Sequence, residues 1–278
     1  MNILKFIESF GDERTLQNVG SRRESFSQLG NIGKNVALAS IPFGLSALSN
    51  KSFAADISPT PSTPIGALQL ALTLEYLERE FYQTALDTIG LIPPLENGGR
   101  DLKVFQQISQ HENDHVDFLI AGLGGTGSAN FVMKPTFDFT AGGTFSDVFS
   151  NYQTFLALAQ AFEDTGVRAY KGQAANLIGD DALLTAALQI HSVEARHASE
   201  VRRLRMQKGW ITGNTSAPAP AAQAVYNGEE NTVQAGFNTA TVNNGTNGPA
   251  ISALAGSEAF DEPLTTMETV AIANLFIV

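Results

Sequence analysis

Two segments of the chain share the pattern Gln-Ile-x-x-x-Glu-x-x-His, and this repeat constrains the fold more than any other feature. The first segment contains Glu112 and His115, and the second contains Glu194 and His197. Residues three apart on a helix lie on the same face, so each Glu and His can bind one metal ion from the same side. The repeat therefore predicts two helices that present matching Glu-His pairs to a common site.

Each of these segments follows an apolar helix that carries a glutamate and, seven residues later, a tyrosine. These pairs are Glu75 with Tyr82 and Glu163 with Tyr170. A single Glu-His pair would be unremarkable in a chain with four histidines. Two such pairs with shared flanking residues, each after a helix with the same Glu-Tyr spacing, indicate an internal duplication of a helical hairpin.

Proline, glycine and capping residues divide the central part of the chain into four predicted helices. We expect these helices at about residues 64–89, 101–122, 146–177 and 179–209. A glycine-rich connection joins the second helix to the third, and we expect its aromatic residues to pack against the helices: Phe131, Phe137, Phe139 and Phe145. Two helical hairpins joined by one long crossover predict an all-α four-helix bundle.

We predict four parts of the chain: an export signal with its linker (1–55), the helical bundle (56–212), a low-complexity extension (213–256) and a terminal helix docked on the bundle (257–278). The extension has few large apolar residues, so we expect it to be extended or mobile. A capping box at Thr265 and Glu268 predicts the start of the terminal helix. The arginines at the end of the fourth helix are expected to be solvated: Arg202, Arg203 and Arg205.

The first fifty-five residues have the order of an export signal. Arg22 and Arg23 precede an uncharged stretch over residues 35–50, and small residues follow at Ala54 and Ala55. The paired arginines resemble a twin-arginine signal, although the following phenylalanine comes one position late. The apolar stretch is too short for a membrane helix. We therefore expect cleavage near Ala54 or Ala55, an exported protein in the periplasm or outside the cell, and no stable membrane span after processing.

Composition narrows the chemistry that a site in this chain can perform. The chain has no cysteine, which excludes thiolate metal sites, iron–sulfur clusters and cysteine nucleophiles. Its net charge of -11 argues against a nucleic-acid partner.

Four glutamates in one apolar core would repel one another, and two divalent cations would remove that repulsion. Because the ligands are rich in oxygen and poor in nitrogen, iron or manganese suits the site best.

We therefore predict a site for two iron ions, or two manganese ions, with six ligands: Glu75, Glu112, His115, Glu163, Glu194 and His197. Glu78 is a rival or additional ligand. Tyr82 and Tyr170 can bond to ligand carboxylates or serve only as core aromatics. His191 can carry protons or add a ligand, although a solvated or hydrogen-bonded histidine is the simpler interpretation. His111 is expected to point away from the site.

The segment Glu-Tyr-Leu-Glu-Arg-Glu-Phe-Tyr at residues 75–82, with Phe-Asp-Glu-Pro at 260–263, resembles the ferritin-like superfamily and its exported, desiccation-related branch. The resemblance covers about residues 63–209 and implies the ferritin-like bundle and its di-metal ligation. It leaves the activity open among iron oxidation, peroxide reduction and manganese catalase.

We expect a di-metal protein that reacts with dioxygen or peroxide in oxidative or desiccation stress. A manganese catalase and a non-catalytic structural or metal-carrier protein are the alternatives, and a homo-oligomer is compatible with the sequence.

Overall fold

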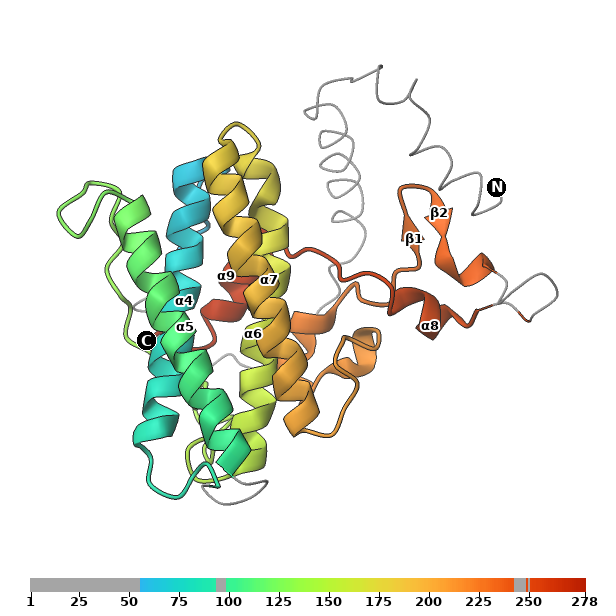
Figure 1. Ribbon diagram of the computed structural model, residues 1–278, viewed down its shortest axis with the longest axis horizontal. Coiled ribbons are helices and arrows are strands. Elements are labelled where there is room, and N and C mark those ends of the chain that lie inside the picture. The colour runs from blue at the N-terminus through green and yellow to red at the C-terminus, as the bar shows by residue number, and fades with distance from the viewer. Residues whose placement is uncertain (1–55, 94–98, 243–248, 250) are drawn as a thin grey trace. The chain divides into compact units, whose positions relative to one another are not determined.

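The computed structural model of the protein describes residues 56–93, 99–242, 249 and 251–278. The predicted export signal lies outside these residues. Four long helices form the described core: α4 (Pro64–Asp87), α5 (Arg100–Gly122), α6 (Tyr152–Leu177) and α7 (Asp181–Leu204). Helix α4 packs against α5 and α6, and α6 packs against α7 (Figure 1). The predicted all-α four-helix bundle is confirmed.

Side-chain caps set the starts of three of these helices. Thr63 caps α4 and Asp180 caps α7, and each accepts a hydrogen bond from a backbone N–H of the first turn. Helix α6 begins at Tyr152, six residues after the predicted start at residue 146. The reason is Asn151, whose side chain accepts a hydrogen bond from the N–H of Gln153 and fixes the first turn there.

Aromatic side chains fill the core at one end of the bundle. Phe81, Phe105, Phe155 and Phe162 are all buried in one cluster. The crossover between α5 and α6 adds Phe139 and Phe145 to this cluster, while its other two aromatics, Phe131 and Phe137, are partly buried against the core. The expectation that the crossover packs through its aromatic residues is confirmed.

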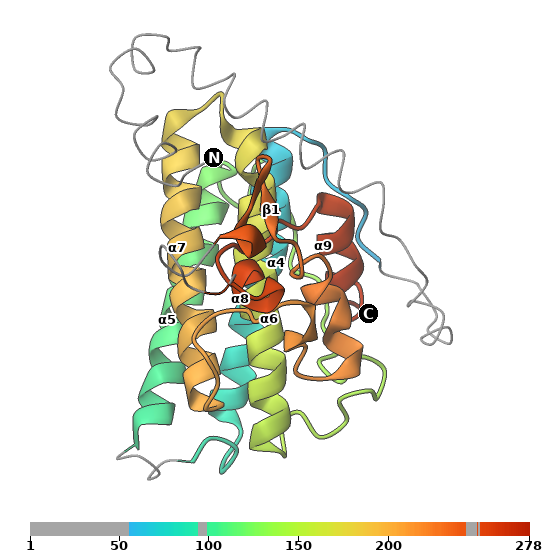
Figure 2. The ribbon, with the colours of Figure 1, turned by 90° about the vertical axis from the view of Figure 1, so that its right-hand side faces the viewer.

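Short elements follow α7: η3 (Asn214–Ser216), η4 (Pro220–Tyr226), β1 (Val233–Gln234), β2 (Phe237–Asn238), η5 (Thr239–Thr241), α8 (Ala253–Ser257) and α9 (Thr266–Ala273). The prediction of an extended or mobile segment is wrong for the described part up to residue 242, because η4 packs on α6 and buries Val225 and Tyr226. The capping box of Thr265 and Glu268 is confirmed. Helix α9 lies against α4 and α6 (Figure 2).

A buried polar network ties α6 to α7 and to the segment after α7. Both oxygens of Asp164 accept hydrogen bonds from Arg202 at 2.5 Å. The hydroxyl of Tyr226 also donates to Asp164, at 2.5 Å. The prediction that Arg202 is solvated is therefore wrong: its charge is buried because Asp164 on the facing helix compensates it.

A second buried ion pair joins α6 to the segment after η4. The Nε of Arg168 lies 2.9 Å from Glu229, and its guanidinium also donates to the carbonyl oxygens of Val225, Asn227 and Glu262. Helix α6 is thus buried on its outer side as well as its inner side. No helix within the described part of the chain is long and apolar enough to cross a membrane.

Candidate metal centre

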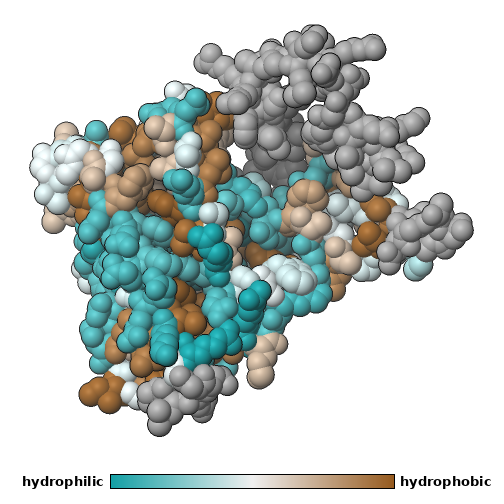
Figure 3. All heavy atoms as spheres, viewed as in Figure 1, coloured by the Kyte–Doolittle hydropathy of each residue, from teal (hydrophilic) through white to brown (hydrophobic). Residues whose placement is uncertain are grey.

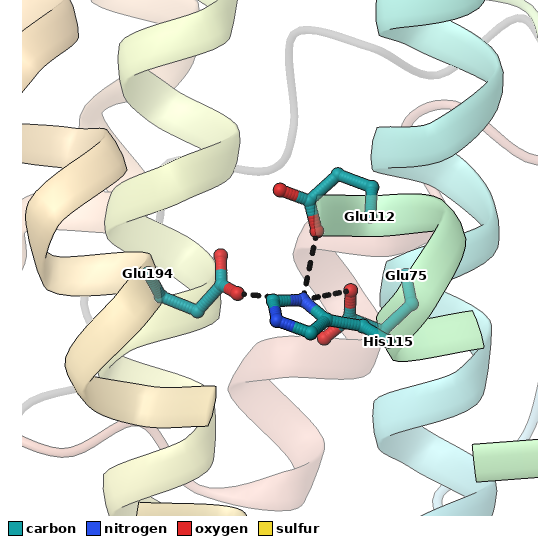
Figure 4. A group of neighbouring side chains, drawn as sticks. All are labelled: Glu75, Glu112, His115 and Glu194. Atoms are coloured by element: carbon teal, nitrogen blue, oxygen red, sulfur yellow. Dashed lines mark hydrogen bonds and ion pairs between the residues drawn. The ribbon is translucent and has the colours of Figure 1, made fainter. Parts of the chain in front are cut away.

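The first group of possible ligands surrounds His115 of α5. The Nδ1 atom of His115 lies 3.2 Å from Glu75 Oε2, 3.1 Å from Glu112 Oε2 and 3.1 Å from Glu194 Oε1. These carboxylates come from α4, α5 and α7, and Figure 4 shows them converging on the imidazole ring. One ligand atom from each of the four residues lies within 4.8 Å of the others, so the group could hold one metal ion.

The second group surrounds His197 of α7. Its Nδ1 atom lies 2.9 Å from Glu112 Oε1, 3.3 Å from Glu163 Oε2 and 3.7 Å from Glu194 Oε2. These four residues also satisfy the 4.8 Å limit and could hold a second ion. All six residues predicted as ligands therefore lie in at least one of two adjacent groups, and all six are buried.

Glu112 and Glu194 belong to both groups. Each of them directs one carboxylate oxygen to His115 and the other oxygen to His197. Glu75 serves only the first group, and Glu163 serves only the second. If two neighbouring ions bind, Glu112 and Glu194 could contribute to both, while Glu75 and Glu163 would each contribute to one.

Several buried atoms of the site lack hydrogen-bond partners among the described residues. They are Glu112 Oε1, Glu163 Oε2, both carboxylate oxygens of Glu194 and His197 Nδ1. These atoms approach one another closely, but they are not aligned for hydrogen bonds. Buried polar atoms without partners are costly, and a metal ion between them would satisfy their lone pairs. The donor set of four carboxylates and two imidazoles thus fits iron or manganese.

Two tyrosines hold the terminal carboxylates. The hydroxyl of Tyr170 on α6 donates to Glu75 Oε1 at 2.6 Å, and the hydroxyl of Tyr82 on α4 donates to Glu163 Oε1. Each tyrosine therefore reaches across to the glutamate of the other hairpin. The hydrogen bonds leave the second oxygen of each carboxylate free to face its histidine.

The metal-free site holds its protons tightly. Burial lowers the pKa of His115, but close contacts with three carboxylates outweigh burial and raise that pKa to about 12. Burial raises the pKa of Glu163 to about 7 and, together with the charge of Glu194, raises the pKa of Glu112. Burial also acts to raise the pKa of Glu194, but its close contacts with the two protonated histidines dominate and lower it to about 2. The histidine protons therefore act as counter-charges where metal ions would otherwise be.

His111 lies beside the site, and the expectation that it points elsewhere is wrong. Its Nδ1 atom is 2.9 Å from Nε2 of His197, the ring nitrogen that faces away from the carboxylates. Its own Nε2 atom is 2.8 Å from the side-chain amide of Gln107. The spacing of His111, four residues before His115, would place both side chains on one face of α5 and is the sequence signal that could have placed His111 near the site.

Glu78 is buried next to the site but belongs to neither ligand group. Burial raises its pKa, and the charge of Glu194 raises it further. A Cβ atom added at Gly166 would lie 3.3 Å from Glu78 Oε1 and 3.5 Å from Glu194 Oε2. The glycine therefore leaves room for these two carboxylates on the side of α6. His191, the other predicted neighbour, is half-buried, and burial lowers its pKa. It also lies outside both groups.

Comparison with known families agrees with this geometry. A family model described as the ferritin-like domain matches residues 63–207 of the chain. The chain belongs to this family. The matched range of the ferritin-like domain begins at the cap of α4, ends just beyond α7 and contains all six candidate ligands. No curated protein and no solved structure matches the chain.

Proposed function

We propose that this ferritin-like domain binds two iron ions, or two manganese ions, through the six clustered residues and reacts with dioxygen or peroxide. The observation that carries the proposal is the position of Glu112 and Glu194, whose paired oxygens are divided between the two histidines. When bound, two adjacent redox-active ions would supply electrons for cleavage of an O–O bond.

The protein's own residues would orient and shield this centre. Tyr82 and Tyr170 hold the terminal carboxylates, and His111 contacts the outer nitrogen of His197 so that its Nδ1 atom faces inward. Burial of all four carboxylates excludes bulk water, which strengthens electrostatic interactions within the site.

We also propose that the protein is exported and acts in oxidative or desiccation stress. Support comes from the signal-like order of residues 1–55 and from the resemblance of residues 75–82 and 260–263 to the exported, desiccation-related branch. N-terminal sequencing of protein recovered from outside the cytoplasm tests this proposal, and an intact Met1 on that material would contradict processing.

The decisive test of metal binding is the double variant Glu112→Gln and Glu194→Gln, because it removes both shared carboxylate charges with little change in shape. Anaerobic titration with Fe(II) or Mn(II) should give two ions per chain for the wild type and none for the variant. At free metal of about 100 times Kd, binding at one site should add about 2.7 kcal/mol of stability to the wild type alone.

Glu200→Gln is the matched control, since Glu200 is also on α7 but pairs with Arg100 outside the site. It should bind metal as the wild type does. If metal raises the melting temperature of the double variant as much as that of the wild type, these residues are not the ligands. Elemental analysis of the bound metal and measurement of gas evolution from peroxide then separate an iron oxidase from a manganese catalase. Metal binding without turnover would indicate a structural or carrier role.

A further inference from the structure

An apolar pocket lies inside the bundle, against one side of the candidate metal centre. All four long helices line it, and it leaves about 20 Å³ of space for the centre of a water-sized sphere. Tyr170 forms part of its wall and donates a hydrogen bond to Glu75, one of the candidate ligands. The pocket therefore ends one side chain away from the metal centre.

The internal duplication explains why the described residues leave a pocket on this side of the metal centre. Three alanines that line it stand at the positions that three phenylalanines occupy in the other half of the repeat, at the same distance in sequence from the ligand glutamates. The matching pairs are Ala67 with Phe155, Ala169 with Phe81, and Ala187 with Phe105.

The three phenylalanines pack against one another in their half of the bundle. The ring centroids of Phe81 and Phe155 are 5.1 Å apart, and those of Phe105 and Phe155 are 4.9 Å apart. All three side chains have no exposed surface. On the opposite side of the metal centre, methyl groups replace these rings and leave the space unfilled. The pocket beside Glu75 therefore exists because alanines replace phenylalanines in one of two otherwise matching halves of the bundle.

The lining offers almost no hydrogen bonds to a guest. Among its described residues only Tyr170 and Gln173 have polar side chains. The hydroxyl of Tyr170 is bonded to Glu75, while the amide of Gln173 donates to Thr266 and accepts from Asn176. Hydrogen peroxide would lose its hydrogen bonds to water on entry, which is costly. Cavities of this kind stay dry and accept small apolar guests such as xenon.

The outer end of the pocket reaches the surface. Its lining includes Phe118 of α5, which is 44% exposed, and the half-buried Leu183 and Ala187 of α7. On the face of the bundle that α5 and α7 form, hydrophobic patches interrupt the hydrophilic surface (Figure 3). An apolar molecule can therefore enter between these two helices.

We infer that this pocket binds dioxygen and delivers it to the metal centre, so that dioxygen rather than peroxide is the oxidant that the protein admits. The inference rests on the proposed function for its last step, since only a loaded centre would consume the gas. Binding in the pocket itself requires no metal.

Xenon is the probe for binding in the pocket. Crystals of the metal-free full chain under xenon pressure should show xenon between Ala67, Ala169 and Ala187. Ala187→Phe, which copies Phe105 of the other half, should abolish that peak. Leu188→Phe adds the same ring at the next, exposed position and should leave xenon bound. Absence of xenon from the wild type, or an unchanged peak in Ala187→Phe, would overturn the inference.

The kinetics of metal oxidation test whether the pocket delivers dioxygen to the metal centre. With Fe(II) loaded, Ala187→Phe should slow oxidation by dioxygen about tenfold, equivalent to about 1.4 kcal/mol, and leave oxidation by hydrogen peroxide unchanged. Ala67→Phe, which copies Phe155, provides a second variant if the first does not fold. Equal slowing with both oxidants would refute the assignment of dioxygen. If neither the wild type nor these variants bind metal, the proposed function fails. The xenon experiment still shows whether the pocket binds an apolar gas.

Discussion

At the scale of single residues, both ring nitrogens of His197 contact polar side chains. Nδ1 faces three carboxylates and Nε2 faces His111. A ligand histidine is commonly oriented by a partner at its outer nitrogen. The equivalent position before Glu194 is Val193, which has no polar side chain, so the matching contact for His115 cannot form. The two candidate metal positions are therefore inequivalent.

Replacement of His111 should expose this inequivalence. In His111→Phe the ring of His197 loses its polar partner, and we expect the affinity for one of the two ions to fall by about 10–100-fold. The ion beside His115 should be nearly unaffected. Anaerobic titration with a spectroscopically visible ion such as Co(II) would measure both affinities separately.

His191→Phe serves as the control, because His191 is a histidine of α7 outside both ligand groups. It should retain two affinities like those of the wild type. If the affinities for both ions fell equally in His111→Phe, the substitution would perturb the bundle as a whole and would not act through His197.

The sequence predicted the cluster of six candidate ligands because their spacing along each helix fixes which face they share. It did not predict the contact between His111 and His197, since that contact joins two helices and depends on their rotation about their axes. Arg202 was misjudged for the same reason: only the facing helix shows that Asp164 is its partner.

At the scale of elements, the close approach of α6 to the segment before α9 depends on Gly172. A Cβ atom at this position would lie 1.9 Å from the carbonyl oxygen of Leu264. The N–H of Leu264 also donates to the carbonyl of Arg168, at 3.0 Å. The terminal segment thus lies directly on the backbone of α6, where no larger side chain fits.

We predict that Gly172→Ala destabilises the protein even though alanine favours a helix by about 1 kcal/mol. The added methyl group must displace the segment at Leu264, at a cost of about 1–3 kcal/mol. Chemical denaturation measures the stability, and limited proteolysis should show faster cleavage near residues 258–265. In Gly179→Ala, where no atom lies within 4 Å of the added Cβ, the stability should stay unchanged or rise. A Gly172→Ala protein as stable as the wild type would contradict the tight docking.

Helix boundaries followed from local sequence where a cap or a glycine marks them, as at Thr63 and Thr265. The start of α6 was placed too early, because Val148 and Phe149 continue the apolar pattern ahead of the cap at Asn151. The burial of Tyr226 could not be predicted from the composition of its segment, because one large side chain that docks on α6 outweighs many small polar neighbours.

At the scale of the whole molecule, the clustered charges link stability to pH in the absence of metal. Folding raises the pKa of Glu163 from 4.5 to about 7 and that of His115 from 6.5 to about 12. A raised pKa gives stability that is complete below the unfolded-state value and is lost as the pH rises through the folded-state value. The metal-free protein should therefore lose stability from about pH 5 upward, first as Glu163 ionises near pH 7 and then toward about pH 12 as His115 loses its proton.

Calorimetry in the presence of a chelator would test this expectation across the same pH range. Metal-loaded protein should show a smaller decline, since bound cations replace the protons as counter-charges. The double variant Glu112→Gln and Glu194→Gln should also decline less, because it lacks two of the interacting carboxylates. A melting temperature of the metal-free wild type that is constant or rises with pH would contradict the expected coupling.

The burial of Arg168 has a consequence for how the protein is made. Its guanidinium bonds to the carbonyl groups of Val225, Asn227 and Glu262, which are separated from it by 57, 59 and 94 residues in sequence. When α6 leaves the ribosome, none of these partners has yet been translated. Contacts of such long range form late and slowly. The outer side of α6 must therefore stay hydrated during synthesis, and the segment after α7 can cover it fully only after translation has passed residue 262.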